Sequence, residues 1–222
     1  MTVTIATLDI QAEVAAITDA LAARRDPAYE WGMRRTVPSL QPAHATRVPD
    51  VRRVASEWWG AHRPVAPNEV LALCDALWAT GWREERIVAI SLIAGSRAVL
   101  AIADWERLVG WSRDIDNWEH VDHLAGVTGR LLIADPARLS RAAALETSES
   151  PWQRRLALVT LIVAFMKAGM FRDDLASMAD RLQKDKHPIV KRAVVWARDR
   201  LRKDQLDDAL TADEGGRTHA AL

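Results

Sequence analysis

Apolar residues recur every three or four positions along most of the chain, which is the spacing of one face of an α-helix. The stretches 87–94 and 156–163 show this pattern clearly. Proline stands where several such stretches begin, a position at which its missing N–H leaves no hydrogen bond unmade. The pattern therefore predicts one helix after another. We expect them over residues 9–24, 27–35, 48–62, 67–80, 83–95, 98–109, 115–132, 136–145, 151–168, 171–183, 188–203 and, as a short last one, 204–211.

Two segments lack the helical spacing. Residues 38–46 contain two prolines and read as a connector. Residues 212–222 contain Gly215 and Gly216 and read as a disordered tail. We therefore expect a single domain over residues 1–211, followed by the tail.

A charged residue followed by small apolar residues opens four of the predicted helices. These residues are Arg86, Asp122, Arg155 and Arg192, and they are 36, 33 and 37 residues apart. Such a period indicates paired helices that stack into an α-solenoid of HEAT-like repeats. The expected fold class is therefore all-α, with a concave surface that suits an elongated ligand such as DNA.

Composition agrees with a helical, globular protein. Of the 222 residues, 49% are hydrophobic and 27% are charged, and only ten are glycine and nine proline, which excludes a disordered chain and disfavours a turn-rich β fold. Thirty basic residues balance thirty acidic ones, so the net charge of +0 argues against indiscriminate coating of nucleic acid but allows a local basic face. Cys74 is the only cysteine in the sequence, which excludes an internal disulfide and a cysteine-based zinc site.

The sequence shows no sign of export or membrane insertion. Its first residues lack the basic and apolar regions of a signal peptide, and no apolar run approaches the ~18 residues of a membrane span. We expect a cytoplasmic protein in a reducing compartment.

Tryptophan is overrepresented, with ten residues against one tyrosine and two phenylalanines. This imbalance indicates either a large core or a flat contact surface. Trp118 and Asp122 are four positions apart on a predicted helix, so their side chains project from nearly the same face and can act on one ligand. The alternative is structural: a tryptophan packed on the next repeat, and an aspartate that holds two repeats in register.

Basic residues gather at the start of two later helices. Arg154 and Arg155 follow Trp152, while Lys191 and Arg192 precede Trp196. Guanidinium and ammonium groups are what phosphate recognition requires, although a solvated charged face is the simpler explanation for any one of them. Tryptophan faces attract cations, and a carboxylate stabilises positive charge on a reacting sugar. A damaged, cationic nucleotide satisfies both demands.

From about residue 27 to 205 the chain resembles the AlkD-like DNA alkylation repair glycosylases, which are HEAT-like solenoids that wrap duplex DNA. Four motifs match in order and spacing. They are Trp118-Glu-His-Val-Asp122 for the family's Trp-Asp-x-Val-Asp, Trp152-Gln-Arg-Arg155 for its Trp-x-x-Arg, Arg192-Ala-Val-Val-Trp196 for its Lys-Ala-x-x-Trp, and Pro49-Asp-Val-Arg52-Arg53 for its N-terminal Arg-Arg segment.

The resemblance implies a monofunctional glycosylase that excises N3-alkyladenine and N7-alkylguanine from duplex DNA as a monomer, without metal or cofactor and without flipping the base into a pocket. Asp122 would be the catalytic carboxylate, and Trp118 and Trp196 would lie beside the lesion. The residues that we expect to contact DNA are Arg34, Arg52, Arg53, Arg154, Arg155, Lys191 and Arg192.

The chain departs from the family at two positions, one inside these motifs and one before them. Glu119 replaces the first aspartate of the Trp-Asp-x-Val-Asp motif, and Gly32 stands where the family has an aromatic, with Tyr29 and Trp31 close by. Some proteins of this fold bind unusual DNA without excising anything. The alternative function is therefore a non-catalytic HEAT-like scaffold that binds a peptide or a branched nucleic acid.

Other chemistries find little support in the sequence. His120 and His123 are three apart on a helix, a spacing that can bind metal, but no second histidine-rich helix completes a ligand set. A glycine-rich phosphate loop and a Gly-x-Ser-x-Gly elbow are both missing. Nucleotide cofactors and serine hydrolysis are therefore not expected.

Overall fold

The computed structural model describes residues 7–219, with side chains up to residue 206. Helices form most of this part, which contains no strand, so the all-α expectation is confirmed for the described residues. The helices are α1 (Ile10–Ala22), α2 (Pro27–Thr36), α3 (Val48–Ala61), α4 (Pro67–Ala79), α5 (Arg83–Ala94), α6 (Arg97–Ile102), α7 (Trp105–Trp111), α8 (Trp118–Ala134), α9 (Leu139–Ala144), α10 (Pro151–Ala168), α11 (Arg172–Leu182) and α12 (Pro188–His219). Three short 3₁₀ helices, at Ser112–Asp114, Pro136–Arg138 and Leu145–Thr147, join some of them.

Local sequence signals explain most helix starts. Pro27, Pro67, Pro151 and Pro188 each occupy the first position of a helix, as expected. In α2 the carboxylate of Asp26 also accepts hydrogen bonds from two backbone N–H groups of the first turn, which have no partner within the helix. The predicted connector between α2 and α3 is non-helical.

The predicted helix 98–109 is wrong, because two short helices occupy this stretch. The backbone of Ala103 is extended, and the Asp104 carboxylate accepts a hydrogen bond from the Glu106 N–H, so that α7 starts afresh at Trp105. The sequence contained this signal, since aspartate is a preferred N-terminal cap.

Three other boundaries differ from the prediction. Helix α8 begins at Trp118 rather than residue 115, because Asn117 Oδ1 accepts from the His120 N–H and caps it. Residues 136–145 divide among a 3₁₀ helix, α9 and the first residue of the next 3₁₀ helix. Helix α12 continues to His219, well beyond residues 203 and 211. It contains no proline after its first residue, and each of its two glycines costs only about 1 kcal/mol. Residues 220–222 of the expected tail lie outside the described residues.

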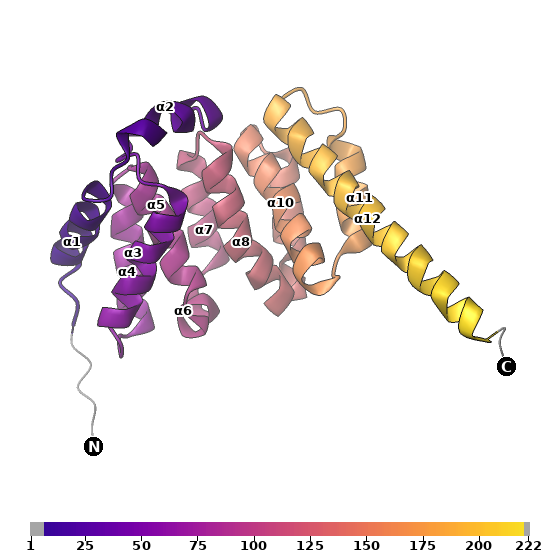
Figure 1. Cartoon of the computed structure of the whole chain (residues 1–222), viewed down its shortest axis with the longest axis horizontal. Helices are drawn as coiled ribbons and strands as arrows, with labels where there is room; N and C mark the ends of the chain where they lie inside the picture. The colour runs from indigo at the N-terminus through magenta and orange to yellow at the C-terminus, as the bar shows by residue number, and fades with distance from the viewer. Residues whose placement is uncertain (1–6, 220–222) are drawn as a thin grey trace, which may run out of the picture. The chain divides into compact units, whose positions relative to one another are not determined.

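The contacts divide the chain into two compact units, one ending at Leu131 and the other beginning at Leu132, within α8. The expectation of one domain over 1–211 stays a prediction. In the first unit α5 packs against α3 and α4, and α1 packs against α3 and α4, as Figure 1 shows in its indigo and purple part. Consecutive residues 83–90 of α5 are all buried, so this helix is surrounded on every side.

The second unit is built around α10, which packs against α11 and α12. Gly169 ends α10 in the left-handed conformation, with φ of 65°, where glycine meets no steric penalty. The chain then reverses into α11. The residues Asp122, Arg155 and Arg192, which revealed the sequence period, lie in the first two turns of α8, α10 and α12, and Arg86 lies in the first turn of α5.

Several tryptophans are core residues rather than surface ones. Trp58, Trp59, Trp78, Trp105 and Trp111 are all buried, and Trp78 stacks on Trp111 with ring centroids 4.6 Å apart. Much of the tryptophan excess therefore meets a demand for core volume. Cys74 is buried as expected. In the part of the chain that the structure describes, no helix has the length and apolar character needed to cross a bilayer.

Candidate functional site

The first two turns of α8 bring Trp118 and Asp122 to one cavity of about 280 Å³. Both side chains are half-buried, whereas Val121 and Leu124 on the neighbouring apolar stripe are fully buried and anchor the helix. Arg52 of α3 also lines the cavity. The expected convergence of an indole and a carboxylate is thus present, with a guanidinium beside them.

A second cavity, of about 370 Å³, shares Trp118 and Glu119 with the first. Its other walls come mainly from α2, including Tyr29, and from Arg47, whose guanidinium lies over the Tyr29 ring at 4.9 Å. Trp118 Nε1 donates a hydrogen bond to the Thr36 carbonyl at 2.8 Å. Because its N–H is engaged by α2, this indole can offer only its ring atoms to a ligand.

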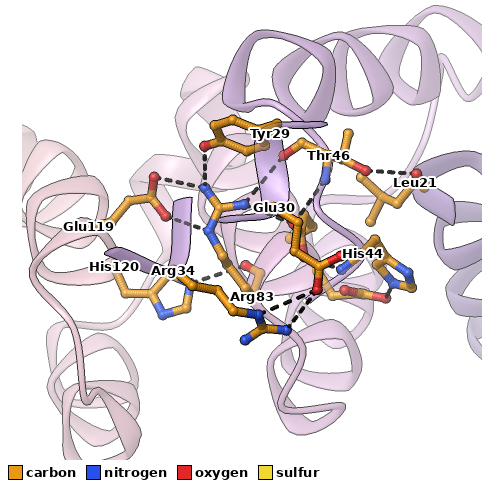
Figure 2. A network of polar contacts seen from close by, with 11 residues as sticks. Leu21, Tyr29, Glu30, Arg34, His44, Thr46, Arg83, Glu119 and His120 are labelled. Atoms are coloured by element: carbon orange, nitrogen blue, oxygen red, sulfur yellow. Dashed lines mark hydrogen bonds and ion pairs between the residues drawn. The ribbon is translucent and has the colours of Figure 1, made fainter. Parts of the chain in front are cut away.

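A buried network, drawn in Figure 2, adjoins both cavities through Glu119. The Arg83 guanidinium donates to both carboxylate oxygens of Glu119, at 2.7 and 2.9 Å, and to Glu84 at 2.8 Å. It also donates to the Tyr29 hydroxyl at 3.4 Å. Burial lowers the pKa of Arg83, but the adjoining Glu119 carboxylate outweighs this and the pKa is raised, so the group is charged. Arg83 thus ties α5 to α8 and α2.

The connector before α3 completes the network. Glu84 accepts hydrogen bonds from the backbone N–H groups of His44 and Thr46, at 3.0 and 3.2 Å. The ring of His44 lies 2.8 Å from a carboxylate oxygen of Glu85. Glu84 and Glu85 are both fully buried. The connector is therefore fixed against α5 by buried carboxylates.

Two histidines flank Asp122 and are held neutral. Burial lowers the pKa of His120 to about 3, and its Nδ1 accepts from Asn117 while its Nε2 donates to the Arg83 carbonyl, both at 3.0 Å. Burial, together with the charge of Arg52, lowers the pKa of His123 to about 4. Both ring nitrogens of His120 are occupied and cannot bind metal. Within the described residues, no group of three potential metal ligands forms.

Comparison with known families agrees with this geometry. The family model described as DNA alkylation repair enzyme matches residues 17–208, which is most of the chain. The chain belongs to the DNA alkylation repair enzyme family. A search among curated proteins gave no match. The resemblance inferred from the four sequence motifs is thereby confirmed for the family.

Where the family resemblance implies an aromatic side chain, this chain has Gly32. Tyr29 lines the cavity beside Trp118, one helical turn before Gly32. Trp31 is 70% exposed, with the Arg35 guanidinium 4.7 Å from its ring. Tyr29 is therefore the aromatic residue placed next to the candidate site.

The basic residues predicted in the first unit have different surroundings. Arg52 is exposed and lines the Asp122 cavity. Arg53 is exposed and pairs with Asp50 at 3.0 Å. Arg34 pairs with Glu30 at 3.4 Å and lines a separate cavity of about 460 Å³ at the connector. Only Arg52 of these three lines the Asp122 cavity.

The residues predicted in the second unit fall into two groups. Lys191 and Arg192 are exposed near the start of α12, and Trp196 is half-buried one turn later. Arg154 instead pairs with Asp185 at 2.6 Å, and Arg155 is buried and donates to the Ile189 carbonyl at 2.9 Å. Their contact with DNA, and the meeting of Trp196 with Trp118, stay predictions.

Sequence analysis missed Arg83, Glu84 and Arg47, and it named Glu119 and Tyr29 only at places where the chain departs from the family. The sequence gives no reason to place the charged cluster of Arg83, Glu84 and Glu119 inside the protein. A charged triplet, Arg83-Glu-Glu85, in front of a strongly apolar helix was the only available signal for this cluster.

Proposed function

We propose that this protein is a monofunctional DNA glycosylase that removes cationic alkylated purines, such as N3-alkyladenine and N7-alkylguanine, from duplex DNA. The bond that breaks joins the base nitrogen to C1′ of the deoxyribose. The alkylated base already carries a positive charge, so it departs as a neutral molecule with the bonding electron pair. Water then adds to C1′ and its proton passes to solvent.

The observation that supports this proposal best is that Trp118 and Asp122 line one cavity. A carboxylate there stabilises the positive charge that develops on the sugar, and it orients the attacking water. The indole ring attracts a cationic base through its π face. Because the Trp118 N–H is engaged by Thr36, the ring is held in place before the substrate arrives.

We further propose that the lesion is recognised while it remains in the DNA, without a flipped base, as the resemblance to the AlkD-like family implies. The cavity that Trp118 and Asp122 line would then contact the deoxyribose.

The remaining assignments belong to the same proposal. Trp196 would join Trp118 at the lesion, and one chain would act on each lesion. The basic residues would contact backbone phosphates, with Arg52 nearest to Asp122. The residues assigned to phosphates are Arg34, Arg52, Arg53, Arg154, Arg155, Lys191 and Arg192.

Release of methylated base from alkylated duplex DNA tests the proposal. Asp122→Asn keeps the shape of the side chain and removes its charge, so excision should fall by ~10²–10³ while affinity for DNA persists. Asp173→Asn is the matched control, because the Asp173 side chain is 98% exposed and lies on α11.

Two results would contradict the assignment. Unchanged excision by Asp122→Asn would remove Asp122 from the mechanism. Binding of duplex by the wild type with no release of base would favour the scaffold function instead.

A further inference from the structure

A third cavity, of about 390 Å³, lies between α3 and α5 in the first unit. None of the sequence motifs except the Arg52-Arg53 segment points to it. We call it the α3–α5 cavity. Its lining residues are Arg52, Ala55, Ser56, Trp59, Arg63, Ser91, Ala94 and Gly95.

The charge of this cavity is entirely positive. Arg52 and Arg63 line it, and no aspartate or glutamate does. Neither the Arg52 nor the Arg63 guanidinium forms an ion pair with a carboxylate of the described residues. By contrast, Arg53, which follows Arg52 in the sequence, pairs with Asp50. Two arginines that share a cavity without a counter-charge repel each other, and an anion would relieve that repulsion.

Packing holds one of the two arginines in place. The Arg63 guanidinium lies over the Trp59 ring at 5.3 Å, and Trp59 itself is only 8% exposed. Gly95 makes room for this ring, because a Cβ at that position would lie 2.7 Å from Trp59 Nε1. The buried N–H of Trp59 finds no acceptor among the described residues. The cavity wall thus combines a fixed aromatic ring with a cation stacked on it.

The α3–α5 cavity adjoins the candidate active site through one residue. Arg52 lines both this cavity and the cavity that contains Trp118 and Asp122. A chemical group bound against Arg63 would therefore lie near whatever occupies the Asp122 cavity.

We propose that the α3–α5 cavity binds a backbone phosphate of the DNA strand, with Arg63 and Arg52 as its cationic walls. A phosphodiester has the matching negative charge and acceptor oxygens. This inference takes from the proposed function only that duplex DNA is the ligand. Its role is to fix the position of the strand relative to Asp122.

A matched pair of variants tests the charge of the cavity without disturbing the fold. Ser56 is exposed on α3, so Ser56→Glu adds a carboxylate to the cavity and Ser56→Gln adds a neutral side chain of the same shape. Binding of an undamaged duplex should weaken in Ser56→Glu and change little in Ser56→Gln. Equal weakening in both would contradict the proposal.

The phosphate contact itself is tested with Arg63→Gln. The slope of log K against log salt for the undamaged duplex should become shallower by ~0.9, the value for one lost phosphate contact. Arg97→Gln, at an exposed arginine on α6 outside this cavity, serves as control and should leave the slope unchanged.

Neutral methylphosphonates, introduced one at a time along one strand, locate the phosphate. At one position in the strand, the methylphosphonate should weaken binding by the wild-type protein. The same methylphosphonate should not weaken binding by Arg63→Gln any further. If no position shows this coupling, the cavity does not hold a backbone phosphate. Arg63-dependent binding of inorganic phosphate without such coupling would assign the cavity to a small phosphorylated molecule and likewise overturn the proposal.

These binding experiments are independent of excision. If Asp122→Asn and wild type both fail to release base but the coupling to one phosphate is present, the glycosylase proposal fails and the phosphate site stands. If excision depends on Asp122 but no coupling to a phosphate occurs, the phosphate-site proposal fails and the glycosylase proposal stands.

Discussion

At the scale of single residues, His120 and His123 show that burial, and not the residue type alone, decides what a histidine does. Histidine side chains beside a carboxylate in the sequence suggest acid–base or metal chemistry. In the structure both are neutral, and His120 uses its two ring nitrogens to join Asn117 to the Arg83 carbonyl. His120 thereby contributes to the stability of the first turn of α8.

The lowered pKa values of these two histidines predict how the free energy of unfolding depends on pH. Their pKa values in the folded protein are about 3 and about 4, below the ordinary value of 6.5. Between pH 6.5 and 4 the unfolded chain therefore binds more protons than the folded one, so stability is complete above about pH 6.5 and declines as the pH falls. The free energy of unfolding in urea should decrease by about 1.4 kcal/mol per pH unit for each histidine well below pH 6.5.

His123→Gln provides the control for this prediction, because His123 is half-buried and glutamine keeps a polar side chain there. The slope of the free energy of unfolding against pH, between pH 6.5 and 4.5, should become shallower by the amount that corresponds to the uptake of about one proton. A slope identical to that of the wild type would show that His123 is not held neutral in the folded protein.

At the scale of secondary-structure elements, the first turn of α5 fixes the start of α8, the helix that carries the candidate site. Arg83 connects this turn to Glu119 of α8 and Tyr29 of α2 (Figure 2). The residues on either side of it in space are buried carboxylates. Their charges are tolerable only because the guanidinium lies between them.

Removal of that guanidinium should therefore be costly. Arg83→Met leaves Glu84 and Glu119 buried without their counter-charge, and the free energy of unfolding should fall by about 3–5 kcal/mol. Chemical denaturation measures this. Arg53→Met breaks an exposed ion pair with Asp50 and should cost no more than about 1 kcal/mol. A similarly small effect of Arg83→Met would show that the network adds little to stability.

At the scale of the whole molecule, charge is balanced in total but not in distribution. The net charge is +0, yet the α3–α5 cavity is lined by arginines without a carboxylate, and Lys191 and Arg192 are exposed at the start of α12. Local clusters of this kind can attract phosphates when the net charge does not.

Binding of duplex DNA by the whole chain should accordingly depend strongly on salt. Each phosphate contact releases counterions and adds ~0.9 to the slope of log K against log salt. Fluorescence anisotropy with an undamaged duplex between about 50 and 200 mM KCl measures this slope. An affinity that did not change with salt would exclude DNA as the ligand, and Asp122→Asn should bind with the same slope as the wild type.

The sequence by itself determined the class of fold, most helices, the family and the pairing of Trp118 with Asp122. These properties are local: helical spacing, proline at helix starts and residues four apart on one helix depend only on neighbours in the chain. The missed break at Asp104 was also local, and its capping signal was present.

Only the tertiary structure decided which charged residues are buried and which cavities they line. Arg83, Glu84 and Glu85 look like a solvated helix start, but α5 is enclosed by other helices and its first turn has no access to water. Arg63 acquires its place from a ring that packs against Gly95, far from it in the sequence. Burial and cavity formation depend on segments that meet only after folding, so the spacing of residues along the chain does not encode them.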